Sequence, residues 1–75
     1  MNYYKVYTTN ESVEENPRRE WEWAGIKYTL SHAVRLAKCL SNKAFEAEVR
    51  GYDSADETIC HRYYRKGKLH IDMLK

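Results

Sequence analysis

The feature that most constrains this chain is a change in the spacing of its apolar residues between positions 33 and 49. Apolar side chains first recur at i, i+3, i+4 and i+7, as Ala33, Leu36, Ala37 and Leu40. From position 45 to 50, apolar residues instead alternate with charged ones. The first spacing is typical of an amphipathic helix, and the second is typical of a strand with one apolar face. The sequence therefore predicts a helix that leads directly into a strand.

The predicted helix begins near Ser31, whose hydroxyl can accept a hydrogen bond from a free amide of the first turn. It ends at Ser41-Asn42. The small alanines of its apolar stripe let the helix lie close to a sheet. Arg35 and Lys38 fall on the side away from that stripe.

Four further strands are predicted, at residues 3–8, 20–29, 58–64 and 68–74. The last two flank Arg65-Lys66-Gly67, and this glycine permits the positive φ of a tight hairpin turn. Residues 10–19 hold the only proline and have no apolar periodicity, so they are predicted to form a solvated connection.

These elements follow the order β-β-α-β-β-β and predict an α+β fold. We expect an antiparallel sheet of four to five strands with one amphipathic helix packed on one face. A chain of 75 residues has room for one core only, so residues 1–75 are expected to form a single domain.

The second strand contains a shift in its alternation. Trp21 and Trp23 share one phase, whereas Ile26 and Tyr28 are out of phase with them by one residue. A β-bulge at Gly25 would place all four side chains on one face. The alternative is a tight turn there, which would make two short strands.

The final hairpin has an expected register that depends on the length of its turn. A two-residue turn at Lys66-Gly67 would pair Tyr64 with Leu69, Arg62 with Ile71, Tyr63 with His70, and His61 with Asp72. The face that carries Tyr64 and Arg62 would then point inward, and the face that carries Tyr63 would be solvated. A three-residue turn would change this register.

Composition and sequence pattern predict a cytoplasmic protein without a membrane partner. No stretch approaches the roughly 18 apolar residues of a membrane-spanning helix, and the first residues lack the layout of a signal peptide. Cys39 and Cys60 stand far apart in sequence, and a secreted domain of this size usually has more disulfides. Both thiols are therefore expected to be reduced.

No catalytic, metal or cofactor site is predicted. His61, His70, Asp72 and Cys60 are the most enzyme-like group, but consecutive strand residues such as Cys60 and His61 point to opposite faces. There is no CxxC or HxxxH spacing. The carboxylate pairs, at Glu14-Glu15, Glu46/Glu48 and Asp56-Glu57, are expected to be solvated.

Basic residues interleaved with tyrosine predict a binding surface instead. Tyr, Trp and Arg dominate protein–protein hot spots, and aromatic and basic side chains also bind single-stranded nucleic acid. The predicted binding residues are Arg62, Tyr63, Arg65, Lys66, Lys68 and His70 on the hairpin, and Arg35 and Lys38 on the helix.

The seven tyrosines exceed what so small a core accommodates, because each buried hydroxyl needs a hydrogen-bond partner. Several are therefore expected at the surface. Tyr3 and Tyr7 share one side of the first strand and Tyr4 takes the other. An amphipathic aromatic surface suits protein recognition.

The run Ser31-His32-Ala33-Val34-Arg35-Leu36-Ala37-Lys38, followed by Phe45-Glu46-Ala47-Glu48-Val49, resembles small phage-encoded inhibitors, anti-CRISPR proteins among them. The resemblance covers residues 26–50, and no shared motif residues can be carried over. It implies a protein that acts in the host cytoplasm and blocks a host defence complex by surface contacts. The expected partner is thus a protein or a ribonucleoprotein complex. The alternative is a small regulator that binds nucleic acid through the basic and aromatic hairpin.

Overall fold

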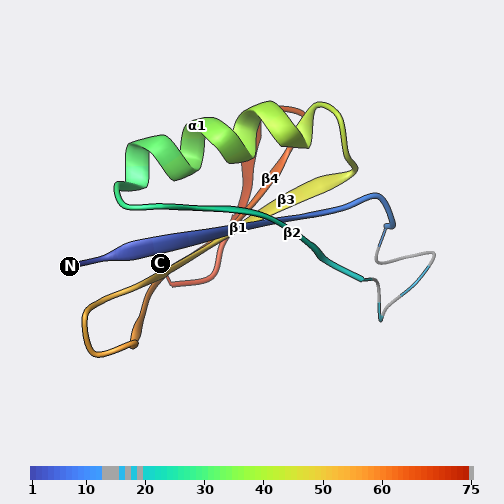
Figure 1. Ribbon diagram of the computed structural model, residues 1–75. Coiled ribbons are helices and arrows are strands. Elements are labelled where there is room, and N and C mark those ends of the chain that lie inside the picture. The colour runs from blue at the N-terminus through green and yellow to red at the C-terminus, as the bar shows by residue number, and fades with distance from the viewer. Residues whose placement is uncertain (13–15, 17, 19, 75) are drawn as a thin grey trace.

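An antiparallel sheet with the strand order β2-β1-β3-β4-β5 carries one helix across one of its faces (Figure 1). The computed structural model describes residues 1–12, 16, 18 and 20–74. The elements of this described part are β1 (Tyr3–Thr9), β2 (Glu22–Lys27), α1 (Leu30–Ser41), β3 (Glu46–Tyr52), β4 (Thr58–Arg65) and β5 (Lys68–Asp72). The predicted α+β class and element order are therefore confirmed. The predicted connection at 10–19 lies partly outside the described residues, and the Glu14-Glu15 pair lies wholly outside them.

Helix α1 begins two residues earlier than the sequence indicated. Thr29 is the N-cap, because it has an extended backbone and its hydroxyl accepts a hydrogen bond from the backbone N–H of His32 at 3.3 Å. Ser31, the expected cap, lies inside the first turn. At the other end, the Asn42 side chain donates to the carbonyl oxygen of Lys38. The prediction of Ser31 as the N-cap is therefore wrong by two residues; threonine and serine are both favourable N-caps.

The core lies between α1 and the sheet. Ala33 and Ala37 on the helix are completely buried, as are Val6 of β1 and Val49 of β3. Because the helix presents alanine at its closest positions, its backbone can approach the sheet without a large side chain between them. The aromatic ring of Tyr64 on β4 completes this cluster and is 2% exposed.

A β-bulge interrupts β2 where the sequence predicted one. Gly25 pairs with Val6 and Trp23 pairs with Tyr7, so Ala24 is the extra residue. Gly25 has φ of +153°, a conformation that favours glycine. The bulge prediction is confirmed over the tight turn, and it places Trp23 and Ile26 on the same face.

The β4–β5 hairpin has the expected two-residue turn, with positive φ at Lys66 and Gly67. Tyr64 pairs with Leu69 as predicted. The other predicted pairs are wrong, because a bulge in β5 adds His70 to that strand. Tyr63 consequently lies opposite Ile71, and Arg62 lies opposite Asp72. One extra residue shifts every later pair, and nothing in the alternation of β5 signals it.

Candidate binding surface

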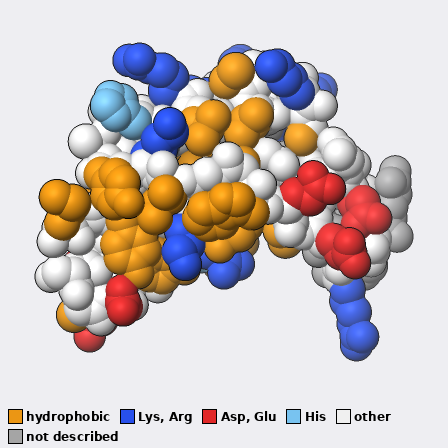
Figure 2. Space-filling view, viewed as in Figure 1, with side chains coloured by type: hydrophobic (Ala, Val, Ile, Leu, Met, Phe, Trp, Pro, Cys, Tyr) orange, Lys and Arg blue, Asp and Glu red, His pale blue; other side chains and the backbone are white. Residues whose placement is uncertain are grey.

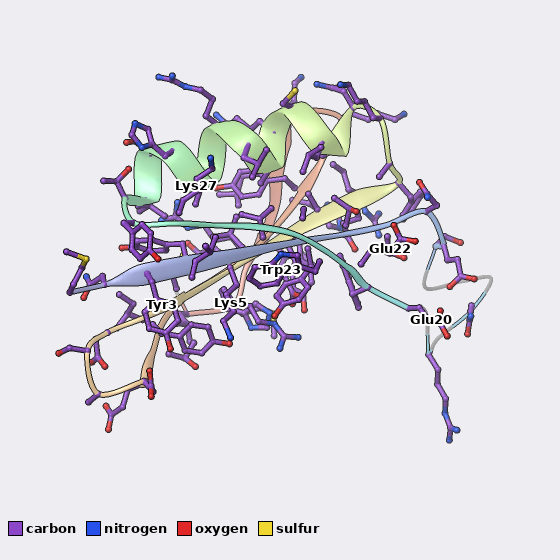
Figure 3. All side chains as sticks on the ribbon, in the orientation of Figure 1. Tyr3, Lys5, Glu20, Glu22, Trp23 and Lys27 are labelled. Carbon is purple, nitrogen blue, oxygen red and sulfur yellow. The ribbon has the colours of Figure 1, made fainter. Side chains whose placement is uncertain are left out.

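The sheet face opposite α1 is lined by aromatic and charged side chains, and we call it the open face. Alternate residues of a strand point to opposite faces, so the residues that alternate with the helix-facing core residues define it. Its members are Tyr3, Lys5 and Tyr7 of β1, Trp23 and Ile26 of β2, Glu48, Arg50 and Tyr52 of β3, and His61 and Tyr63 of β4. Figure 3 shows Tyr3, Lys5 and Trp23 projecting away from α1.

Hydrophobic side chains gather below the helix in the space-filling view, with Lys and Arg side chains between them (Figure 2). Acidic side chains lie toward the two ends of the same view. Trp23 is 56% exposed and Ile26 is 37% exposed, so the surface is accessible to a partner. A contiguous accessible group of aromatic and apolar side chains is typical of an interaction site.

The aromatic rings of the open face are held in place by cross-strand pairs. Tyr3 stacks on its partner Tyr52 with 5.3 Å between ring centroids, and Tyr7 contacts its partner Trp23 edge-on at 5.7 Å. The Lys5 ammonium lies 5.6 Å from the Tyr52 ring centroid. These contacts order the rings in the free protein, so binding would lose little additional side-chain entropy.

Trp21 closes one side of the open face. It precedes β2, and its ring lies 5.8 Å from that of Tyr63 on β4, although β1 and β3 separate those strands in the sheet. His61 lies next to Tyr63, with 5.1 Å between ring centroids. The open face is thus one continuous layer of side chains rather than separate clusters.

Beneath this layer lies the carboxylate of Glu48, which is 1% exposed. Its oxygens are 3.0 Å from Arg50 Nε and 2.5 Å from His61 Nε2. Tyr7 and Tyr63 flank it on the neighbouring strands. The expectation that Glu46 and Glu48 are solvated is wrong. The alternation of β3 correctly assigns their face, but it does not reveal that side chains of β1 and β4 cover it.

The charges around Glu48 shift the titration of its neighbours. Burial alone would lower the pKa of Arg50, but the hydrogen bond and the negative charge of Glu48 raise it above its ordinary value. The pKa of Tyr63 is raised to about 12, mainly by burial and also by the charge of Glu48 and a hydrogen bond to it. Arg50 and Tyr63 are therefore both protonated at neutral pH.

A second buried carboxylate anchors the hairpin. Glu46 is 1% exposed, and its Oε2 lies 2.9 Å from Arg65 Nε. The Arg65 guanidinium also covers the ring of Phe45, 4.6 Å from its centroid. Phe45 was expected on the buried face, but β3 begins at Glu46 and leaves Phe45 36% exposed. Arg65 is thus held by two contacts within the chain.

The structure does not bring the sequence-predicted binding residues together on one surface. Tyr63 belongs to the open face. Arg62 points to the opposite face, where its Nε lies 3.4 Å from an oxygen of Asp72. The remaining exposed members are Lys66, Lys68 and His70 on the hairpin, and Arg35 and Lys38 on α1.

Most of the open face was missed by the sequence reasoning. The shared side of Tyr3 and Tyr7 and the alternation of Trp21 and Trp23 were both visible in the sequence. The order of strands in the sheet was not, and it is this order that places β1 between the tryptophan-bearing strand and β3. Without it, the aromatic residues could not be assigned to one surface.

Comparison with known proteins identified no relative. A scan against protein-family models, a search of curated proteins and a search of solved structures each gave no match. Within the described residues, no helix is long and apolar enough to cross a membrane. The same part of the chain holds no group of three or more His, Cys, Asp or Glu side chains arranged to bind a metal ion.

Proposed function

We propose that this chain is a small binding protein that inhibits or regulates a macromolecular partner by surface contacts, and that the open face makes those contacts. The observation that carries the proposal is the accessible, ordered row of aromatic rings on the side of the sheet that α1 leaves uncovered. Rigid aromatic side chains beside cationic ones are the commonest hot-spot residues of protein interfaces. The 56% exposure of Trp23 supports it as the central anchor.

The distribution of charge favours a protein or a ribonucleoprotein complex as the partner. Asp53, Asp56 and Glu57 lie in the β3–β4 loop, and the hydroxyl of Tyr3 donates to Asp56 at one end of the open face. These carboxylates would repel a phosphate backbone. The cation of Arg50 is already paired with Glu48, which leaves little net positive charge at the centre.

The resemblance to small phage-encoded inhibitors of the anti-CRISPR type is consistent with this mode of action. Such a protein would occupy a site on a host defence complex and block nucleic-acid loading or partner recruitment without catalysis. The small α+β fold and its ordered aromatic face suit steric inhibition, because they offer a rigid contact surface. We propose a phage or mobile-element origin on this basis.

The alternative function is nucleic-acid binding by the same face. The stacked Tyr3 and Tyr52 rings and the exposed Trp23 favour it, because single-stranded bases stack on aromatic side chains of sheet surfaces. This alternative predicts an affinity that falls steeply as salt concentration rises. A flat salt response with single-stranded DNA and RNA oligonucleotides would exclude it.

Affinity capture with matched variants tests the proposed function. The immobilised chain would be exposed to a lysate of its host cells, with and without nuclease treatment. We expect a partner that survives nuclease treatment, binds wild type and Leu69→Ala, and is lost with Trp23→Ala. Leu69 is a suitable control because it is a large apolar residue, is 49% exposed and pairs with the core residue Tyr64 on the opposite face of the sheet. Equal capture by Trp23→Ala would contradict the proposal, and loss on nuclease treatment would favour the alternative.

A further inference from the structure

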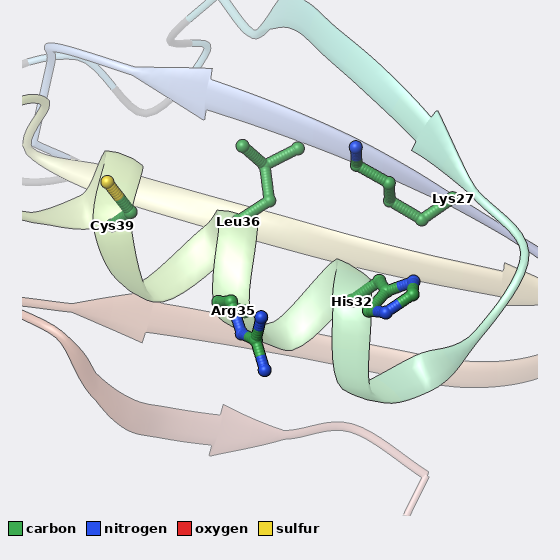
Figure 4. Close-up of a pocket in the computed structure, with 5 residues that line it drawn as sticks. All are labelled: Lys27, His32, Arg35, Leu36 and Cys39. Carbon is green, nitrogen blue, oxygen red and sulfur yellow. The ribbon is translucent and has the colours of Figure 1, made fainter.

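We infer that a groove between α1 and β2 binds a small organic anion that carries an apolar group. The groove has a volume of about 420 Å³, within the usual range of small-molecule sites (Figure 4). It is lined by Lys27, His32, Arg35, Leu36 and Cys39. None of these side chains belongs to the open face, so this inference is independent of the proposed function.

The positive charge of the side chains that line the groove favours an anionic ligand. Lys27 and Arg35 carry positive charge, His32 adds an imidazole ring, and none of the described residues that line the cavity has a carboxylate. None of these three side chains takes part in an ion pair or hydrogen bond within the described part of the chain. Their charges are therefore available to a ligand. The first turn of α1 has no acidic residue either, so the positive end of the helix dipole is not neutralised there.

The apolar part of the ligand would lie on Leu36. This side chain points from α1 toward the sheet, and Lys27 extends from β2 along the same gap (Figure 4). Gly25 faces Leu36 from β2, and a Cβ placed at Gly25 would lie 3.8 Å from Leu36 Cδ2. Because glycine has no side chain there, the hydrocarbon surface of Leu36 stays accessible. An amphipathic anion would therefore contact cations at the rim and leucine at the base.

Cys39 provides a local reporter of occupancy. Its side chain lines the groove and is exposed, whereas Cys60 is 7% exposed. Burial also raises the pKa of the Cys60 thiol, which keeps it in the unreactive protonated form. Iodoacetamide, an uncharged reagent, is therefore expected to alkylate Cys39 selectively. A ligand in the groove would shield that thiol.

The experiment measures the rate of Cys39 alkylation by mass spectrometry with octanoate as the probe. We expect saturating octanoate to slow alkylation several-fold. Octylammonium, with the same chain and the opposite charge, should give no protection. Inorganic phosphate, which has no apolar group, should protect only weakly. Absence of protection by octanoate, or equal protection by either control, would overturn the inference.

Two variants locate the site. Lys27→Met combined with Arg35→Gln keeps most of each side chain and removes both charges, so the dissociation constant of octanoate should rise roughly tenfold. Lys38→Gln removes a neighbouring charge of α1 that does not line the groove, and it should leave binding unchanged. Circular dichroism would verify that both variants fold. Unchanged octanoate affinity in a folded double variant would contradict the inference.

Discussion

Glu48 connects the stability of this chain to the shape of its open face. Its carboxylate lies beneath the aromatic layer and is shared by Arg50 and His61. A carboxylate that is 1% exposed loses its hydration, so its charged partners must compensate for that loss. Arg50 also covers the ring of Tyr7, with 5.6 Å between its Cζ atom and the ring centroid. The Arg50 side chain therefore contacts both the buried carboxylate and an aromatic ring of the open face.

Glu48→Ala should lower the free energy of unfolding by roughly 2–3 kcal/mol, because the change removes the counterion of a partly buried arginine and leaves a cavity. Urea denaturation followed by circular dichroism measures the loss. Glu57→Ala is the matched control, since Glu57 is exposed and the change should stay within about 0.5 kcal/mol. Equal stability of the two variants would show that Glu48 is not a structural residue.

Tyr63 should make the chain sensitive to alkaline pH. Its pKa is about 12 in the folded protein and 10.0 when unperturbed. Between these values the unfolded state loses a proton that the folded state keeps, so stability declines as pH rises from 10 to 12. Below pH 10 both states are protonated and Tyr63 causes no pH dependence. Tyr63→Phe should therefore reduce the decline without abolishing it, because the hydrogen bond to Asp56 also raises the pKa of Tyr3 to about 12. Thermal unfolding across this range would measure the difference. A decline of the same slope in Tyr63→Phe would assign the effect to another group.

The burial of individual side chains was harder to predict from the sequence than any other feature of this structure. The period-2 alternation assigned Glu46 and Glu48 to the face away from the helix, and it did so correctly. Whether Glu46 and Glu48 are exposed to solvent on that face depends on side chains of strands distant in sequence, such as Tyr7 and Tyr63. Burial of this kind is a property of sheet order, which local patterning does not contain.

At the scale of elements, two hydroxyl residues near the start of α1 have different roles: Thr29 caps the helix, and Ser31 lies inside it. Thr29→Ala should destabilise the protein by about 1 kcal/mol, because it removes the acceptor for the His32 amide. Ser31→Ala is the matched control and should have a much smaller effect, since Ser31 lies within the helix. Chemical denaturation of both variants decides between them. A larger loss in Ser31→Ala would restore the sequence-based assignment of the cap.

Strand β3 requires glycine at position 51 because of its neighbours. A Cβ there would lie 2.6 Å from Tyr4 Cε1 and 2.8 Å from Cys60 Cβ, closer than such atoms approach in proteins. Gly51→Ala should therefore cost roughly 1–3 kcal/mol in urea denaturation. Adding Tyr4→Leu, which removes the crowding ring atoms, should make the alanine better tolerated than it is alone. Wild-type stability of Gly51→Ala would contradict the close packing of β3 between β1 and β4.

Element types were predictable because each has a strong local signal. The helix follows from its 3.6-residue apolar spacing, and the bulge in β2 follows from the change of phase between Trp23 and Ile26. The bulge at His70 was missed, because Leu69 and Ile71 continue an ordinary alternation across it. A bulge is visible in sequence only where it shifts the apolar phase.

At the scale of the whole molecule, one face of the sheet is covered and the other is not. Helix α1 packs over β1, β3 and β4 and buries its alanine stripe, which leaves the aromatic residues of the far face to solvent. The α+β fold was predictable, since it follows from the number and type of elements. The candidate site was not, because it is assembled from four strands whose order in the sheet the sequence does not reveal.

The central claim is that the open face, anchored by Trp23, binds the partner. The dissociation constant of the captured and purified partner would be measured for wild type, Trp23→Ala and Leu69→Ala, after thermal unfolding confirms that each is folded. The account predicts a loss of at least 2 kcal/mol, roughly thirtyfold, for Trp23→Ala, and no change for Leu69→Ala. Wild-type affinity of Trp23→Ala, with binding lost instead in the hairpin-tip variant Lys66→Glu, would contradict it.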